Sequence, residues 1–572
     1  MPTGQKQLKK MNNRIIKDYL ESLKEDKELD YIFPILLNSI GFRIISTPRN
    51  SKGQPQYGKD IVAIGKADNG TIYRWYFELK GNAAKDITDA TFNARDGVRE
   101  SILAAKDVPY EDSSIPSFDK LPWKIIFVHT GVLNEGTRIQ FDNFIKREFP
   151  NGGFERWDIE KLTELFSEYL FNEYLLCDLE SHKLLKKILV LLDAPGWNTN
   201  DLDRLIDIQL NLYSPKKKNK RLLHKCLSSI NLLLAIIYQY SQETNNLLPA
   251  KKSSDRIVLK TWAWILKNDY EKNSIIIKSF ARIVNLHFEI YRAYFHKILP
   301  LTQFYKGFYM PQGLEAEQVC YPLRCYDCMN DFLYYITAYN MKFPEKKNMY
   351  IKDQLGTVIN LLKNNPGFDI PLLDNHAITL QLLIKFIFQN DYTEKDAFEF
   401  QKFIVRLVSN IIIRKKRYDM FPELHGNRKR VALSIYKKST DYQDSSSLFL
   451  MNLIEIVAWA NQEYLYKCLR DCIIESGVNL QISYPIESDD LEIKLFEHKL
   501  YEEMSVQTNI KLPETISEFN KSFKKRYNPI KLKTNETSFD YLIILAHLHY
   551  QTDWFPDFLN LGYWEPIQEK KE

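Results

Sequence analysis

Residues 59–80 read KDIVAIGKADNGTIYRWYFELK and predict the two strands of a hairpin. The first strand is a short run of apolar, mostly β-branched residues from Asp60 to Gly65, and a turn signal at residues 67–70 follows it. In the second strand, residues 71–80, large apolar side chains alternate with polar ones, so that Glu78 and Lys80 share one face. Pairing of the two strands therefore places Asp60 near Glu78 and Lys80.

These three residues are of the types that hold a divalent cation against a phosphate. Mg²⁺ takes oxygen ligands and usually one or two carboxylates, and it keeps water and phosphate oxygens in its other positions. Asp60 and Glu78 are the candidate carboxylates, and the main-chain carbonyl of Leu79 is a candidate third ligand. Lys80 would orient the attacking water or hold the phosphate as a point charge. The set predicts phosphodiester hydrolysis that depends on Mg²⁺, with Mn²⁺ as a possible substitute.

A Glu-x-Lys triplet is weak evidence alone, because charged residues often alternate on a solvated strand, and the surrounding elements give it weight. A helix is predicted over residues 28–42 and a strand over residues 43–46. After the hairpin, residues 87–105 are helix-like and residues 123–130 form a buried-strand run. The predicted N-terminal domain is thus α/β, with a mixed central sheet flanked by helices.

In this order the residues resemble the Mrr-like branch of the PD-(D/E)xK restriction endonuclease superfamily, over about residues 20–175. The motifs that carry the resemblance are Leu-Leu-x-x-x-Gly-Phe at 36–42, Gly-x-Asp at 58–60, Glu-x-Lys at 78–80, His-Thr-Gly at 129–131 and an apolar strand, Asp and helix start at 154–162.

The resemblance implies a restriction-endonuclease-like fold, with metal-binding acids at Asp60 and Glu78 and a catalytic lysine at Lys80. It also implies an acidic residue on the first helix, for which Asp30 stands at the matching distance and Glu28 is the alternative. The chain departs from the family in having Glu78 where many members have glutamine, and in the loop at residues 48–55 before the aspartate.

The remainder of the 572-residue chain is predicted to be helical. We expect a nuclease-like domain at residues 1–175 and helical domains at 176–365 and 366–572, or one continuous all-α region, with a division near residues 364–367 and a break at 242–255. Apolar residues at helical spacing predict these helices: 180–192, 201–212, 222–243, 257–266, 274–298, 329–338, 378–388, 398–413 and 448–476.

Composition predicts a folded cytoplasmic protein. The chain is 45% hydrophobic and 26% charged, its most apolar stretch at 230–237 is shorter than the ~20 residues of a membrane span, and the polar start is unlike a signal peptide. Seven cysteines argue against a disulfide framework. A net charge of +5 leaves local basic clusters as candidate phosphate contacts, at 216–221, 414–417, 427–430 and 524–526.

Cys320, Cys325 and Cys328 are close enough in sequence to form part of a zinc site. The remaining ligand would come from His296 or from the pair Cys468 and Cys472. Packing within a helix is favoured, because only Cys325 and Cys328 have the spacing of a metal hook. His547 and His549 lie too close for one helix face, and such residues more often belong to a core or surface than to a ligand set.

Two classes of function are consistent with the sequence. The favoured one is a DNA endonuclease of restriction type, in bacterial defence against phage or foreign DNA, whose helical region binds DNA, senses a trigger or assembles a homodimer or higher oligomer. The alternative is a non-catalytic platform that binds nucleic acid or a partner ATPase or helicase. The intact set of Asp60, Glu78 and Lys80 favours the enzyme, because buried like charges cost folding free energy unless a cation neutralises them.

Overall fold

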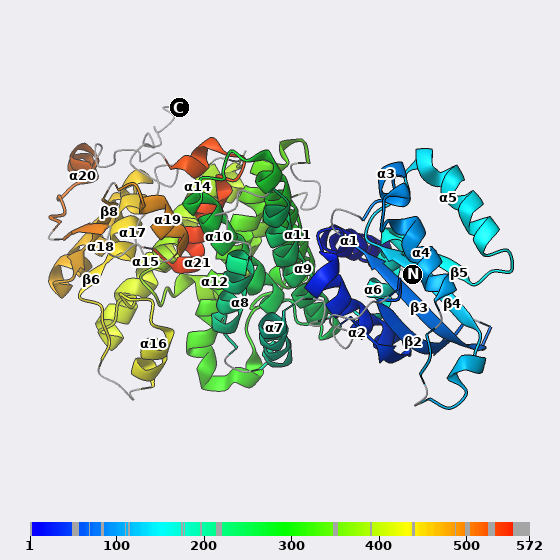
Figure 1. Ribbon diagram of the computed structural model, residues 1–572. Helices are drawn as coiled ribbons and strands as arrows, with labels where there is room; N and C mark the ends of the chain where they lie inside the picture. Colours follow the sequence, from blue (N-terminus) through cyan, green and yellow to red (C-terminus); the bar gives the residue numbers. More distant parts are fainter. Residues whose placement is uncertain are drawn as a thin grey trace. The chain divides into compact units, whose positions relative to one another are not determined.

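The computed structural model of the chain divides into two compact units (Figure 1). The first unit comprises residues 1–261 and 272–287, and the second comprises residues 262–271 and 288–572. The residues described are 3–48, 57–67, 69–81, 85–108, 110–112, 115–172, 176, 178–194, 197–212, 220–346, 353–388, 390, 392–436, 441–486, 488–497, 504–508, 510–523 and 532–552.

A five-stranded mixed sheet in the order β1-β2-β3-β4-β5 forms the centre of the first unit. The pairs β1–β2 and β2–β3 are antiparallel, whereas β3–β4 and β4–β5 are parallel. The strands are β1 (Arg43–Ser46), β2 (Ile61–Lys66), β3 (Ile72–Lys80), β4 (Trp123–His129) and β5 (Phe154–Trp157). The predicted hairpin is confirmed as β2 and β3, and the strands predicted at 43–46 and 123–130 are confirmed as β1 and β4.

The helices before, between and after the strands cover both faces of the sheet. They are α1 (Thr3–Leu20), η1 (Glu25–Leu29), α2 (Asp30–Ile40), α3 (Asp89–Asn93), α4 (Val98–Asp107), α5 (Glu135–Glu148) and α6 (Ile159–Tyr169). The single helix predicted at 87–105 is wrong, because Thr88 caps a short helix and the chain then turns before Gly97 caps α4. A Cβ at Gly97 would lie 2.6 Å from the Thr91 carbonyl oxygen.

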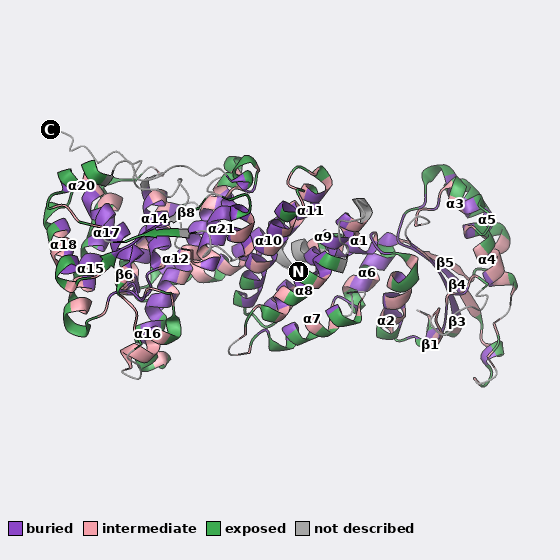
Figure 2. Ribbon diagram, turned by 60° about the vertical axis from the view of Figure 1, so that its left-hand side comes forward, coloured by how far each residue is buried: buried purple, intermediate pink, exposed green. Residues whose placement is uncertain are grey.

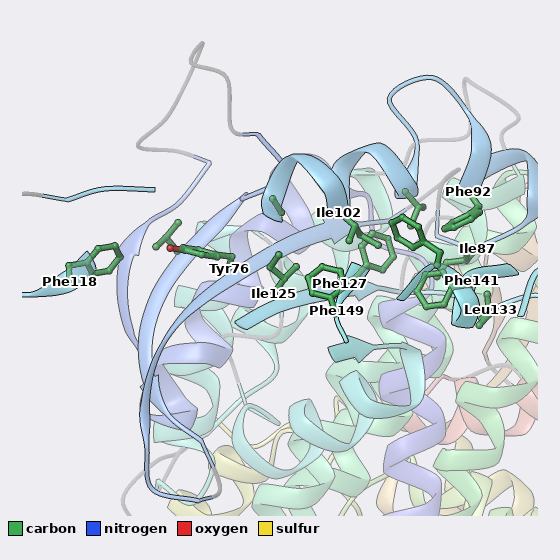
Figure 3. Close-up of a cluster of buried hydrophobic side chains, with 14 residues drawn as sticks. Tyr76, Ile87, Phe92, Ile102, Phe118, Ile125, Phe127, Leu133, Phe141 and Phe149 are labelled. Atoms are coloured by element: carbon green, nitrogen blue, oxygen red, sulfur yellow. The ribbon is translucent and has the colours of Figure 1, made fainter. Parts of the chain in front are cut away.

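One hydrophobic cluster joins the sheet to α3, α4 and α5 (Figure 3). Phe127 of β4 and Ile102 of α4 are fully buried in it, and Phe92 lies edge-on to Phe141 at a ring-centroid distance of 5.7 Å. On the opposite face, Phe77 packs against Phe33 of α2 and Trp157 of β5. Its ring centroid is 5.4 Å from that of Phe33 and 5.6 Å from that of Trp157. The alternating pattern of β3 thus directs its residues into two separate cores.

The first unit continues into helices that the sequence largely predicts. These are α7 (Leu179–Leu191), α8 (Asn200–Leu212), α9 (Lys220–Glu243), α10 (Leu248–Lys267) and α11 (Ser274–Ile298), with the division between units passing through α10 and α11. The break predicted at 242–255 is confirmed but is shorter than predicted, since α9 ends at Glu243 and α10 already begins at Leu248. Its polar residues are buried in pairs: Lys251 Nζ lies 3.2 Å from Asp255 Oδ2, and Ser254 Oγ lies 3.0 Å from His287 Nδ1.

The second unit is largely helical. Its helices of eight or more residues are α12 (Glu317–Lys342), α13 (Gln354–Asn364), α14 (His376–Phe388), α15 (Glu394–Tyr418), α16 (Arg428–Ile435), α17 (Leu448–Trp459), α18 (Glu463–Ser476), α20 (Ile516–Phe523) and α21 (Tyr541–Tyr550). Shorter helices are η6 (Leu299–Gln303), η7 (Pro311–Ala316), η8 (Pro344–Lys346), η9 (Pro366–Asp369), α19 (Leu491–Glu497) and η11 (Lys533–Glu536). Figure 2 shows the long helix α12 largely in the colour of buried residues.

The prediction of an all-α region needs correction, because two small sheets are present. β6 (Ser446–Ser447) pairs in parallel with β7 (Asn479–Leu480), and β8 (Ile482–Pro485) pairs antiparallel with β9 (Met504–Gln507).

The predicted division at residues 364–367 falls inside the second unit, and the boundary at 175 falls inside the first. Asn365 is fully buried, and a Cβ on Gly367 would lie 2.7 Å from Cys325 Sγ, so this segment is packed against α12.

Among the residues that the structure describes, one helix, α9, is long and apolar enough over Leu222–Glu243 to cross a membrane, with a mean hydropathy of 1.3. The apolar stretch predicted from the sequence, residues 230–237, is shorter than this 22-residue apolar part of α9. However, 83% of the apolar window is buried within the fold, as in the core helices of soluble proteins.

The aromatic core behind β4 gives the first prediction. Phe127→Ala should lower the free energy of unfolding of the first unit by about 3–5 kcal/mol, because it removes a fully buried ring and leaves a cavity. Ile139→Ala, on α5 and 75% exposed, is the control and should change it by less than about 0.5 kcal/mol. Denaturant unfolding of the full chain measures both, and similar losses would contradict this account of the core.

Candidate active site

The register of the hairpin places Asp60 opposite Glu78. Ile61 pairs with Phe77 and Val62 with Tyr76, and the same antiparallel register extended by one residue aligns Asp60 with Glu78. Residues aligned in this way point to the same face of the sheet. The backbone N–H of Leu79 donates a hydrogen bond to Asp60 Oδ2 at 2.7 Å and fixes the carboxylate at the end of β3.

Lys80 completes the predicted set. Its Nζ lies 2.7 Å from Glu78 Oε1 and 3.5 Å from Glu25 Oε1, so the ammonium is held between two carboxylates. Glu78 is only 3% exposed. The structure therefore brings together Asp60, Glu78, Leu79 and Lys80, as expected from the alternation of β3. Leu79 takes part through its backbone N–H, which donates to Asp60. The metal-ligand role predicted for its carbonyl oxygen stays a prediction.

The third acid at Lys80 is Glu25, which the sequence analysis did not single out. A Cβ on Gly81 would lie 2.9 Å from Glu25 N, so Gly81 permits the close approach of this segment to the end of β3. Glu28, one predicted candidate, pairs with Lys225 of α9 and accepts a hydrogen bond from Lys24 N.

Asp30, the other candidate, is the first residue of α2 and is half-buried. Its role as the acid of the first helix stays a prediction. Lys27 has φ +65°, which interrupts the helical path between Asp30 and Glu25.

Burial, together with the nearby charge of Glu78, raises the pKa of Asp60 and of Glu25. Burial raises the pKa of Asp60 to about 8, and the nearby charge of Glu78 adds to the effect, against the Leu79 N–H and Lys80, which lower it. Burial likewise raises the pKa of Glu25, although Lys80 opposes it. For Lys80, burial lowers the pKa, but Glu78 and Glu25 together outweigh burial and the net pKa is raised. Lys80 is therefore a stable cation beside an excess of acids.

Lys59 is a second buried cation that the sequence analysis missed. Its Nζ donates to the Val108 carbonyl oxygen at 2.5 Å and lies 5.3 Å from the centroid of the Tyr76 ring. Burial lowers its pKa to about 8, against the attraction of Glu78. No local pattern marks this lysine, because its burial depends on the end of α4, more than forty residues away.

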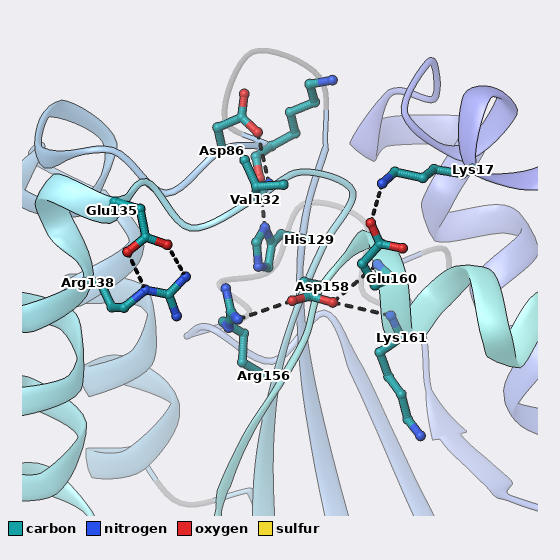
Figure 4. Close-up of polar contacts among 11 residues, drawn as sticks. Lys17, Asp86, His129, Val132, Glu135, Arg138, Arg156, Asp158, Glu160 and Lys161 are labelled. Carbon is teal, nitrogen blue, oxygen red and sulfur yellow. Dashed lines mark hydrogen bonds and ion pairs between the residues drawn. The ribbon is translucent and has the colours of Figure 1, made fainter. Parts of the chain in front are cut away.

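The carboxyl ends of β3, β4 and β5 carry further polar residues (Figure 4). His129, aligned with Lys80, is fully buried, and its Nδ1 lies 2.9 Å from the Lys85 carbonyl oxygen. Because a carbonyl only accepts, Nδ1 carries the proton. Burial lowers the pKa of His129 to about 4, so the ring is neutral near pH 7. Nearby, Arg156 pairs with Asp158 at 3.1 Å.

Asp158 fulfils the strand, Asp and helix-start pattern of the sequence by capping α6. Its Oδ1 accepts hydrogen bonds from the backbone N–H groups of Glu160 and Lys161, both at 3.2 Å. Figure 4 draws these contacts below His129.

The acid set fits a cation that needs few protein ligands. Within the described ranges, no three His, Cys, Asp or Glu residues gather closely enough to hold a metal by themselves. Asp60 and Glu78 supply two carboxylates on one face, which is the number that Mg²⁺ commonly uses. With Glu25 they carry three negative charges when ionised, beside the cation of Lys80. Mg²⁺ bound by Asp60 and Glu78 would relieve the repulsion between the two carboxylates.

In the part of the chain that the structure describes, the three cysteines of α12 join no group of His, Cys, Asp or Glu residues that could hold a metal ion. Cys320 is exposed, whereas Cys325 and Cys328 are buried within α12, and burial raises the pKa of Cys325. His547 is fully buried on α21, where burial lowers its pKa to about 3, and the neighbouring His549 packs edge-on against Tyr550. The preferred reading of these residues as packing groups agrees with their burial.

The basic clusters give little support for phosphate contacts. In the cluster at 427–430, Arg428 forms two hydrogen bonds with Asp327, and Arg430 binds Glu423 and Asp441. In the cluster at 414–417, Arg414 is partly buried and Lys415 pairs with Asp419. The clusters at 216–221 and 524–526 fall mostly or wholly outside the described residues, as does most of the loop at 48–55.

Comparison of the chain with protein-family models, with curated proteins and with solved structures found no match. The geometry of the site is therefore the basis for assigning a function.

The pKa of Asp60 leads to a prediction about stability. Since its pKa is about 8 in the fold and near 4 in the unfolded chain, the fold binds the extra proton, and this contribution to stability is lost as pH rises from about 4 to 8. In EDTA, Asp60→Asn should therefore stabilise the protein at pH 8 by about 2 kcal/mol and much less at pH 5.

Thermal unfolding of wild type and variant at both pH values measures this difference. Asp119→Asn, at an exposed position, is the control and should show no pH-dependent gain. A destabilised Asp60→Asn at pH 8 would mean that the carboxylate is compensated within the fold.

Proposed function

We propose that the chain is a Mg²⁺-dependent DNA endonuclease of restriction type. The observation that carries the proposal is the alignment of Asp60 with Glu78, with Lys80 held 2.7 Å from Glu78, at the end of a strand in a mixed sheet. The order of elements, α2-β1-β2-β3-α4-β4, supports a restriction-endonuclease-like fold for the first unit, in keeping with the resemblance of its motifs.

Each residue has a role in this proposal. Asp60 and Glu78 would hold Mg²⁺, which lowers the pKa of bound water and stabilises charge on the phosphate. Lys80, fixed between Glu78 and Glu25, orients the water or contacts a phosphate oxygen as a point charge. Glu25 positions Lys80. Asp158 fixes the start of α6 beside the carboxyl ends of the strands.

A biological setting follows from the proposed reaction. An endonuclease of this kind fits defence against phage or other foreign DNA in the bacterial cytoplasm. Cutting both strands of a duplex needs two sites, so the proposal includes a homodimer or higher oligomer, and a partner ATPase or helicase is a further candidate.

The direct test is cleavage of plasmid and phage DNA by the purified full chain. Cutting should occur with Mg²⁺ or Mn²⁺, stop with EDTA, and fall at least about a hundredfold, or about 3 kcal/mol in barrier, in Lys80→Ala and Glu78→Ala. The exposed Lys161→Ala on α6 is the control for loss of a lysine and should cut as wild type does.

A second readout does not depend on turnover. Mn²⁺ should raise the thermal unfolding temperature of wild type but not of a double variant lacking Asp60 and Glu78 carboxylates, Asp60→Asn with Glu78→Gln. Metal binding without cleavage, together with equal phage survival of cells carrying wild type or Lys80→Ala, would instead support the non-catalytic platform.

The position of Glu25 predicts which acid supports Lys80. Glu25→Gln should slow cleavage about tenfold, because it removes one of the two carboxylates that hold the ammonium. Asp30→Asn should have a smaller effect. Glu28→Gln should mainly lower stability, since its partner Lys225 is 2% exposed. Initial rates and unfolding temperatures of the three variants distinguish these roles, and a larger rate loss in Asp30→Asn than in Glu25→Gln would refute the assignment.

A further inference from the structure

A segment of the second unit, residues 303–314, displays large apolar side chains to solvent. We call it the displayed segment. Phe304 is 63% exposed, Tyr305 69% and Leu314 76%, and Tyr309 and Met310 are exposed as well. Five such side chains within twelve residues are unusual on a protein surface that contacts only water.

The displayed segment is firmly anchored to α13. Lys306 N donates to the Asn364 carbonyl oxygen at 2.7 Å, and Phe308 N donates to Asn365 Oδ1 at 3.3 Å. Phe308 itself is buried and forms the inner support of the turn. The exposed rings on either side of it thus belong to an ordered turn with a fixed backbone.

An ion pair of α12 between the buried Glu317 and the half-buried Arg324 anchors the other half of the segment. Glu317, 4% exposed, pairs with Arg324 and accepts a hydrogen bond from Met310 N at 2.8 Å. Arg324 Nε donates to the Phe308 carbonyl oxygen at 3.1 Å.

The backbone of the segment is also strained. Lys306 has φ +55° and Leu314 has φ +47°, both in a region that side chains other than glycine rarely adopt. A Cβ on Gly307 would lie 2.0 Å from the Leu301 carbonyl oxygen, so the turn requires glycine there. Strain of this kind persists where the surrounding structure imposes it, and it is concentrated at functional sites.

The chemistry of the segment favours one occupant. Residues 297–314 contain Lys297 and Lys306, and the exposed Glu315 follows directly; Lys306 Nζ lies 5.7 Å from the Tyr305 ring centroid and 5.6 Å from that of Tyr309. Lys363, next to the anchoring Asn364, is exposed. In proteins that bind single-stranded nucleic acid, unpaired bases stack on aromatic rings, and neighbouring lysines form ion pairs with the phosphates.

We propose that the displayed segment binds single-stranded nucleic acid, with bases stacked on Phe304, Tyr305 and Tyr309 and phosphates near Lys306. Bases in a duplex present only their edges, so single strands are the better ligand for exposed ring faces. This binding surface is separate from the residues proposed for catalysis, and it requires neither metal nor cleavage.

The test is fluorescence anisotropy of a labelled 20-nucleotide oligothymidylate with the full chain in EDTA, which prevents cutting. Wild type should bind the single strand more tightly than a duplex of equal length. The double variant Phe304→Ala with Tyr305→Ala should bind the single strand at least about tenfold more weakly, equal to about 1.4 kcal/mol. Lys306→Gln should reduce the dependence of the binding constant on salt by about one phosphate contact.

Tyr464→Ala is the matched control, since Tyr464 is 82% exposed on α18 of the same unit and should not affect binding. Unchanged unfolding temperatures would show that the variants are folded, as expected for exposed side chains. No binding by wild type, or equal binding by wild type and the double variant, would overturn the proposal. Loss of self-association in the double variant, seen by sedimentation with oligonucleotide binding unchanged, would overturn it in favour of an interface between copies. None of these outcomes depends on the nuclease proposal.

Discussion

The register in which β2 pairs with β3 is the constraint on which the candidate site depends, because it brings Asp60 to the ion pair that Glu78 and Lys80 form on β3. In that register Asp60 lies opposite Glu78, and Lys80 extends past the end of the hairpin toward Glu25. A slip of one residue would turn Glu78 and Lys80 to the face now occupied by Phe77 and Leu79. The aromatic residues on both faces of β3 therefore help to hold the site residues in place, because they disfavour any other register between β2 and β3.

Buried acids explain why such a site needs a strong scaffold. Asp60, Glu78 and Glu25 approach one another with Lys80 as the near cation, and burial, with the charge of Glu78 adding to it, raises the pKa of Asp60. The contacts of Phe77 with Phe33 and Trp157, and the cluster around Phe127, stabilise the strands that carry these acids. Sites of this type reduce the stability of the fold in favour of function. The carboxylates that repel one another are the groups that would bind the cation, so replacing them would also remove the binding site.

The sequence predicted what local alternation controls and missed what distant contacts control. The hairpin, its polar face and most helices followed from periodicity, and with them the set of Asp60, Glu78 and Lys80. Glu25 was missed because Lys27, at positive φ, breaks the helical count. The first turns of α10 were read as a break because Lys251 and Asp255 resemble loop residues until they pair inside the fold. Lys59 is likewise buried by an element distant in sequence.

The two units offer different means of recognition, and their combination has a consequence for specificity. Lys80 and the acids of the first unit read only phosphate chemistry, which is common to all nucleic acids. Rings such as Tyr305 in the second unit require accessible bases. Attachment of a strand to the displayed segment would raise its effective concentration near the chain without any new contact at the acids. On these two proposals, the choice of substrate would depend on the second unit, and the rate of hydrolysis would depend on the first.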